Sequence, residues 1–162
     1  MRAAFEERAL HRQTIIALMS AAVLAAIAGC APDDSASRVV TVLSDKCSLD
    51  AINGKADPLV RVKAGVVEFA GWAVDSTTNT VPATLQVFLK DSGSFSYSLE
   101  APHRIDRPDV AAAFKQDGFL KSGFLFQADL SSLKPGAYAL SLKMPDDGRL
   151  VTCPVKKNIV ID

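Results

Sequence analysis

Apolar and polar residues alternate in short runs along most of the chain after about residue 65. The run from 82 to 90 shows this most clearly, because Leu85, Val87 and Leu89 alternate with Gln86, Phe88 and Lys90. A period of two is typical of β-strands that bury one face. On this basis we predict strands over residues 66–75, 82–90, 94–101, 123–130, 137–144, 149–155 and 158–161.

Turn-forming residues separate these runs. Asp91, Ser92 and Gly93 lie between the second and third runs, so we predict that those two strands form a hairpin. Similar turn residues follow at 134–136 and 146–148. About seven short strands joined by turns are typical of an antiparallel β-sandwich.

One segment has a helical period instead. Pro108 and the acidic residues Asp106 and Asp109 are favourable at a helix start, and Val110, Ala113 and Phe114 would share one apolar face. We expect this short helix to end at Gly118. The predicted fold is therefore mostly β, with one short helix, and 162 residues suit one compact domain.

The N-terminal region has a different pattern. Residues 14–29 carry no charge and follow a charged head that contains Arg2, Arg8 and Arg12. The run is shorter than the about 20 apolar residues that a membrane-spanning helix needs, and it fits the apolar region of a secretory signal peptide. The alternative is an uncleaved anchor helix.

The end of this run, Ala-Ile-Ala-Gly-Cys at 26–30, resembles the lipobox of bacterial lipoproteins. The resemblance implies that residues 1–29 are a signal peptide and that Cys30 carries the lipid, so that the protein is anchored to a membrane of the cell envelope. Ala31 follows the cysteine in place of Asp, which favours the outer membrane if the organism has one. Residues 30–45 are then a flexible tether, and residues 46–162 form the folded domain.

Two cysteines remain, Cys47 and Cys153. Compartments outside the inner membrane are oxidising, so we predict a structural disulfide between them. It would close a loop on the order of 100 residues, which the chain-entropy model credits with roughly 4–5 kcal/mol.

Within the domain, a second resemblance rests on an ordered set of short motifs. They are Gly-Trp-Ala-Val-Asp at 71–75, Arg-Pro-Asp-Val at 107–110, Gly-Phe at 123–124, and Leu130, Leu133 and Gly136. The set resembles a small immunoglobulin-like β-sandwich module of bacterial envelope proteins and of some glycosyltransferases. This resemblance implies a non-catalytic, accessory module.

Four residues of these motifs are candidates for a structural or binding cluster. We expect Trp72 to fill the core beside the disulfide or to lie under a loop, and a sugar-stacking platform is the alternative. We expect Arg107 and Asp109 to pair with Asp75 or to cap the helix start, and a ligand site is the alternative. Arg107→Ala should then lower stability more than it changes any binding.

The sequence offers little catalytic chemistry. His103 is the only histidine after the anchor region, no Gly-x-Ser-x-Gly motif occurs, and Asp146, Asp147 and Gly148 fall short of a calcium loop. One histidine and two paired cysteines do not make a zinc site, so we predict no metal and no cofactor. The 18 basic and 18 acidic residues balance, which argues against nucleic-acid binding.

These features predict a lipid-anchored, non-catalytic lipoprotein of the cell envelope that binds a protein partner or acts as an accessory module. The alternative is a module that binds peptidoglycan or surface polysaccharide, which requires at least two of four aromatic side chains to be exposed on one face: Trp72, Phe88, Tyr97 and Tyr138. A small envelope hydrolase is the third candidate, and it requires carboxylates that converge around His103 or Asp109.

Overall fold

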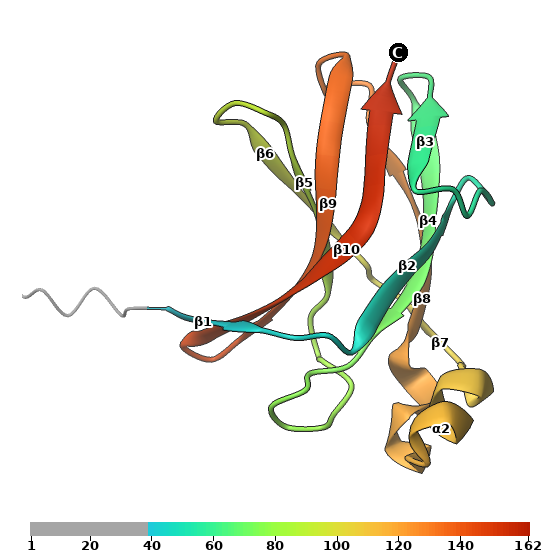
Figure 1. Ribbon diagram of the computed structural model, residues 1–162, viewed down its shortest axis with the longest axis vertical. Helices are drawn as coiled ribbons and strands as arrows, with labels where there is room; N and C mark the ends of the chain where they lie inside the picture. Colours follow the sequence, from blue (N-terminus) through green and yellow to red (C-terminus); the bar gives the residue numbers. More distant parts are fainter. Residues whose placement is uncertain (1–38) are drawn as a thin grey trace, which may run out of the picture. The chain divides into compact units, whose positions relative to one another are not determined.

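The computed structural model describes residues 39–162, and the predicted signal peptide, Cys30 and the tether up to residue 38 lie outside this range. The described part is mostly β (Figure 1). Its strands are β1 (Val40–Leu43), β2 (Cys47–Ile52), β3 (Leu59–Val62), β4 (Val66–Ala73), β5 (Gln86–Lys90), β6 (Ser96–Glu100), β7 (Arg104–Ile105), β8 (Gly123–Asp129), β9 (Gly136–Asp146) and β10 (Arg149–Ile161). Helix α2 (Pro108–Phe114) and the 3-10 helix η1 (Asp117–Ser122) lie between β7 and β8.

The strands form two sheets. Sheet A has the order β1-β10-β9-β5-β6, and β3 is a further neighbour of β10. Sheet B has the order β2-β4-β8-β7. The predicted mostly β fold is therefore confirmed, and so is the hairpin, because β5 and β6 pair antiparallel from Gln86↔Glu100 to Lys90↔Ser96.

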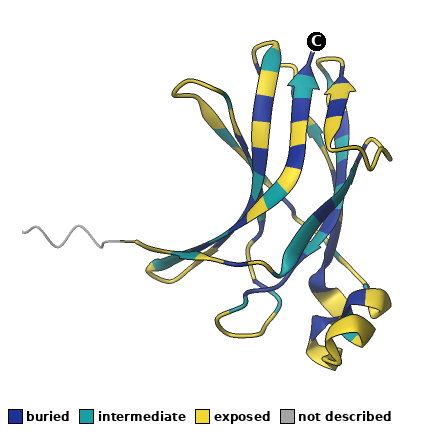
Figure 2. Ribbon diagram, viewed as in Figure 1, coloured by how far each residue is buried: buried dark blue, intermediate teal, exposed yellow. Residues whose placement is uncertain are grey.

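The two sheets face each other across one apolar core, as in a β-sandwich. Every second residue of β4 is buried, and the same alternation runs along β5 and most of β9 (Figure 2). Phe69 of sheet B and Leu142 and Ile159 of sheet A are fully buried members of this core. The alternation of the sequence thus reflects side chains that point inward and outward in turn.

A second, smaller apolar cluster lies under the helical segment. It consists of Val74, Val110 and Phe119, and Trp72 packs against it. The helix begins at Pro108 as predicted, but it ends at Phe114 and not at Gly118. Lys115 adopts the left-handed conformation with φ of 53°, and its backbone N–H satisfies the last carbonyls of the helix, so no glycine is needed there.

Two of the strand pairings are parallel, which corrects the prediction of a purely antiparallel sandwich. β1 and β3 both lie on the same edge of β10 and run in its direction. Between β1 and β4 the chain alternates between the sheets, since β1 and β3 belong to sheet A and β2 and β4 to sheet B. Residue alternation has the same period in parallel and antiparallel strands, so the sequence pattern does not reveal strand direction.

The sequence pattern also missed some of the strands and divided one strand into two. β1 lies inside the stretch predicted as tether (30–45), so the described domain begins earlier than residue 46. β2 and β3 were not predicted. The two runs at 149–155 and 158–161 form the single strand β10, which is interrupted by a bulge after Pro154.

Candidate functional site

The edge of β10 that faces β1 and β3 is open in its middle. β1 pairs with residues 149–152 and β3 with residues 158–161, so no strand of the described chain pairs with residues 153–157 on this edge. Two backbone hydrogen bonds mark the ends of the opening. At one end, Ser44 N–H donates to the carbonyl of Thr152 at 2.9 Å, and at the other, Asn158 N–H donates to the carbonyl of Pro58 at 2.8 Å.

Pro154 and the bulge explain why β10 is irregular here. The pairing of β10 with β9 passes from Pro154↔Ser141 directly to Asn158↔Ala139, so three residues of β10 lie opposite Leu140 alone. Proline lacks the N–H that a ladder needs, and bulges of this kind bend a strand and end its regular pairing. The local sequence thus produces the break in the sheet edge.

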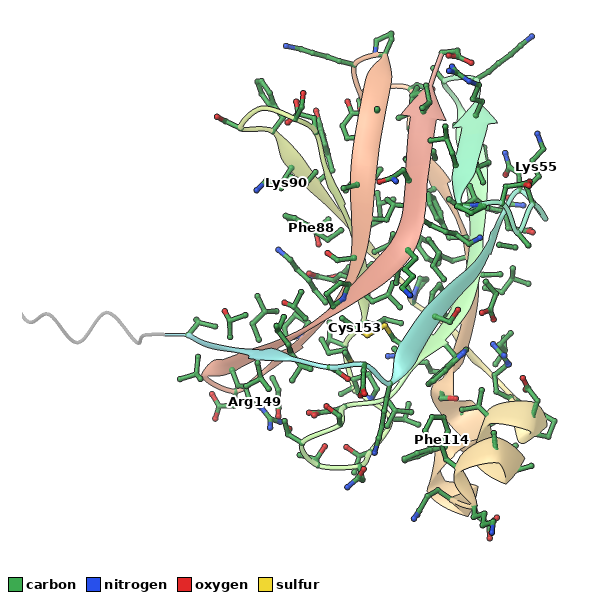
Figure 3. The ribbon with its side chains drawn as sticks, in the orientation of Figure 1. Lys55, Phe88, Lys90, Phe114, Arg149 and Cys153 are labelled. Carbon is green, nitrogen blue, oxygen red and sulfur yellow. A yellow bond between two sulfur atoms is a disulfide. The ribbon has the colours of Figure 1, made fainter. Side chains whose placement is uncertain are left out.

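The disulfide Cys47–Cys153 lies at this opening and joins sheet B to sheet A. Cys47 begins β2, Cys153 lies just before Pro154, and their Cα atoms are 6.3 Å apart (Figure 3). The predicted bridge is therefore confirmed. It fixes β2 beside the open stretch of β10, although the two strands belong to different sheets.

Together these segments surround a groove of about 1000 Å³. Residues 43–45 close one end, residues 47–50 and 154–157 form the two long sides, and Ala56 and Pro58 lie at the other end. β2 pairs only with β4 in the described chain, so each long side of the groove is a strand without a partner on the groove side.

The charged side chains beside the groove are largely used within the fold. Lys157 is 8% exposed, and its Nζ donates to the backbone carbonyls of Ala56 and, at 3.0 Å, of Asp57. Asp50 binds Arg107 at 2.7 Å. Asp45 and Lys156 remain exposed at the groove. The groove therefore offers mainly backbone edges and small or apolar side chains, with one free charge of each sign.

The structure places the four predicted cluster residues in three locations, because only Arg107 and Asp109 contact each other. Arg107 and Asp109 form a two-pronged pair, with Nε to Oδ1 at 2.8 Å and Nη2 to Oδ2 at 2.7 Å. Arg107 also reaches Asp50 of β2, because a register shift between Leu49 and Ala51 leaves Asp50 outside the pairing with β4. The hydrogen bond and charge of Arg107 lower the pKa of Asp109 to about 2.

Asp75 takes part in a different network and does not contact Arg107. It is 4% exposed, and it binds Arg149 at 2.9 Å and accepts hydrogen bonds from the backbone and the hydroxyl of Thr77 at 2.8 and 2.6 Å. Burial acts to raise the pKa of Asp75, but these bonds and Arg149 outweigh it, so that the pKa is lowered. Asp75 thus fixes the loop after β4 to the start of β10, where Figure 3 labels Arg149.

The aromatic residues do not form an exposed platform. Tyr138 is buried, and its hydroxyl donates a hydrogen bond to the carbonyl of Lys134 at 2.7 Å. Tyr97 packs against the main core. Trp72 lies under the helical segment, 5.7 Å from Phe114 between ring centroids. Phe88 lies in sheet A, where the ammonium of Lys143 covers its ring. No two of the four therefore share an exposed face.

The residues expected for a hydrolase either lie exposed in a loop or are bound to Arg107. His103 is exposed, between β6 and β7. Asp50 and Asp109 do converge, but on the guanidinium of Arg107, which keeps Asp109 ionised and so unsuited to act as a general acid. Over residues 39–162, no group of three or more His, Cys, Asp or Glu side chains could hold a metal ion.

Sequence reasoning identified the disulfide at this site but not the groove. Its one local signal is Pro154, near the end of the run at 149–155, because a proline within a strand interrupts regular pairing. In the described part of the chain, no helix has the length and apolar character to cross a membrane. Comparison with protein-family models, with curated proteins and with solved structures gave no match.

Proposed function

We propose that this chain is a lipid-anchored, non-catalytic lipoprotein of the cell envelope, anchored through Cys30. In this proposal its β-sandwich is an immunoglobulin-like module, and it binds an extended segment of a partner protein in the groove beside β10. The observation that carries the proposal is the open edge of β10 at residues 153–157. Unpaired strand edges bind extended peptides through main-chain hydrogen bonds. Pro154 and the bulge prevent a full ladder here, so a bound segment would make only a few such bonds, with Pro154 as an acceptor only.

The shape of the groove supports a peptide over a compact ligand. Its two long sides are the free edges of β2 and β10, and the disulfide fixes their spacing. Three of its six polar side chains are bound within the fold, so much of the recognition would come from backbone groups and from contacts with Pro58 and Val155. A segment of the partner carrying a charge of either sign could pair with Asp45 or Lys156.

Site-specific crosslinking in cells tests this binding mode. A photo-crosslinking residue at Lys156, beside the groove, should capture one protein through one short segment, identified by mass spectrometry of the crosslinked peptide. The same residue at Asp147, exposed in the turn before β10, is the matched control and should capture none. Ser48→Trp, which fills the groove from β2, should abolish the crosslink at 156. Equal crosslinking at both positions, or no effect of Ser48→Trp, would contradict the proposal.

The carbohydrate alternative has its own measurement. Cosedimentation of the full chain with purified peptidoglycan and with surface polysaccharide should show no saturable binding, because no two of the four aromatic side chains share an exposed face. Saturable pelleting that survives Ser48→Trp would favour the carbohydrate-binding module.

The lipid anchor is tested separately. Cys30→Ser should abolish labelling with a fatty-acid precursor and leave the N-terminal segment uncleaved, because the thiol is the site of acylation in the proposed lipobox. Ala31→Ser is the control and should be labelled and processed normally. Normal processing and membrane association of Cys30→Ser would refute the lipoprotein assignment while leaving the groove proposal intact.

A further inference from the structure

The opposite edge of sheet A is also unpaired. β6 pairs with β5 on one side, and no other strand of residues 39–162 lies on its free side. Figure 1 shows the β5–β6 hairpin standing at the margin of the sheet, away from β10. This edge is therefore distinct from the groove, which lies beyond β10.

The hydrogen bonds of the hairpin show which backbone groups are free. Ala101 N–H donates to the carbonyl of Leu85 at 2.9 Å, and Asp91 N–H donates to the carbonyl of Phe95 at 3.2 Å. In an antiparallel pair, alternate residues bond to the partner strand, so the odd-numbered residues of β6 face β5. The backbone N–H and C=O groups of Ser96, Ser98 and Glu100 consequently point away from the sheet.

β6 has few of the features that protect a free edge against pairing, and its one charged residue is Glu100 at its end. Its sequence, Ser-Tyr-Ser-Leu-Glu, contains no proline, lysine or glycine, and its register with β5 has no bulge. Proline, lysine and bulges hinder pairing at a free edge, and the open stretch of β10 has all three while β6 has none. Tyr97 and Leu99 pack on the core but are only half-buried, and Phe95, at the start of the strand, is 55% exposed.

We propose that a second copy of this chain adds its own β6 to this edge, antiparallel, with Ser98 opposite Ser98 on a two-fold axis. In this register Ser96 faces Glu100 of the other copy, and all three residues with free backbone groups are paired, by about six hydrogen bonds. Registers shifted along the strand leave at least one of the three unpaired, so the register centred on Ser98 is favoured. The two copies then share one continuous sheet.

Charge complementarity favours a second copy as the occupant. Lys90 lies beside Ser96 in the β5–β6 register, and both are exposed (Figure 3 labels Lys90). In the dimer, one cross-strand row contains Lys90 and Ser96 of one copy and Glu100 of the other copy. The two-fold axis generates a second, equivalent row. On the inner face, Tyr97 meets Leu99 of the other copy, which covers side chains that are half-exposed in the monomer.

The dimer leaves the groove open, because β6 and the open stretch of β10 belong to opposite sides of sheet A. The inference therefore does not rest on the proposed function.

Disulfide trapping of the full chain in cells tests the dimer. Ser98→Cys should form a covalent dimer on mild oxidation, because the two residues lie directly opposite each other. Ser92→Cys, equally exposed but in the turn before β6, is the matched control. We expect at least about fivefold more covalent dimer for Ser98→Cys than for Ser92→Cys, since direct cross-strand neighbours lie within about 5.5 Å between Cα atoms. Equal yields, or no dimer with Ser98→Cys, would overturn the proposal.

A charge exchange separates this register from other modes of association. In the Ser98→Cys background, Lys90→Glu should lower the dimer yield by about fivefold, because each of the two symmetry-related rows would then hold two carboxylates in place of an ammonium and a carboxylate. Adding Glu100→Lys should restore the yield, and Lys63→Glu, exposed and distant from β6, should leave it unchanged. A yield that Lys90→Glu leaves unchanged, or that Glu100→Lys fails to restore, would overturn the register.

Discussion

Gly71 occupies a place in β4 where the two neighbouring strands leave no room for a side chain. A Cβ atom on this residue would lie 2.2 Å from the carbonyl oxygen of Ser48 and 2.7 Å from Cζ of Phe124. Both atoms are held in place, the first by the backbone of β2 and the second by the core. The glycine of the Gly-Trp motif is therefore required for packing, because β2 and Phe124 approach the backbone of β4 so closely.

Gly71→Ala should accordingly destabilise the fold by about 3 kcal/mol, the upper range for an over-packed core position. Denaturant unfolding measures this effect. Gly118→Ala is the matched control, since a Cβ there meets no atom within 4 Å and Gly118 has no positive φ, so its effect should be small. Equal unfolding midpoints for the two variants would contradict the packing argument.

At the scale of single elements, α2 is held to sheet B by its apolar contacts with Trp72 and by the guanidinium of Arg107. Arg107 precedes the helix and bridges Asp109 in its first turn to Asp50 in β2. The three residues of this helix start have separate roles: Pro108 begins the helix, and Arg107 and Asp109 form the ion pair that links its first turn to Asp50. Arg107→Ala leaves Asp50 without its partner and should lower the melting temperature.

The same ion pair predicts a pH dependence. The pKa of Asp109 is lowered to about 2 in the folded protein, from about 3.9 in an unfolded chain. Because the folded pKa is depressed, the carboxylate stabilises the fold fully above about pH 5, and this stabilisation is lost as the pH falls towards 2. The difference in unfolding midpoint between the wild type and Asp109→Asn should therefore be constant above pH 5 and should shrink between pH 4 and 2. A difference that does not change over this range would refute the pairing.

The elements also show what the sequence can and cannot predict. Periodicity located β4, β6, β8 and β9 closely, because each packs alternate side chains against the main core. It missed β1, whose side chains are mostly exposed, and β3, which has only four residues. Neither strand carries enough local pattern, and both exist because β10 offers them an edge.

The candidate site was less predictable for the same reason. The disulfide followed from the count of cysteines and their compartment, but the groove depends on which part of an edge is left unpaired. That is decided by contacts between residues about 100 positions apart, which no local window contains. Arg107 was expected to pair with Asp75 or to cap the helix start. Its side chain makes no cap hydrogen bond and binds Asp109 and Asp50 instead, the latter presented by the bulge in β2.

For the whole molecule, the Cys47–Cys153 bridge is the main covalent constraint, with a sequence separation of 106 residues. Replacing both cysteines by serine should lower the free energy of unfolding by roughly 4–5 kcal/mol, the loop-entropy value for about 100 residues. Equilibrium unfolding of the variant measures the loss, and reduced wild-type protein should match it. A loss below about 1 kcal/mol would show that the bridge does not restrict the unfolded chain as the loop-entropy account requires.

The position of β10 has a consequence for the order in which the domain can assemble during synthesis. β10 is the last strand of the domain in the sequence, yet it lies inside sheet A, where β1, β3 and β9 all pair with it. Sheet B, in contrast, is complete once residue 129 is available. A growing or partly translocated chain can therefore build sheet B early, while three strands of sheet A wait with unsatisfied edges. Such long-range pairing folds slowly and leaves aggregation-prone edges exposed, so the domain would depend most on protection during the last moments before residues 149–161 emerge.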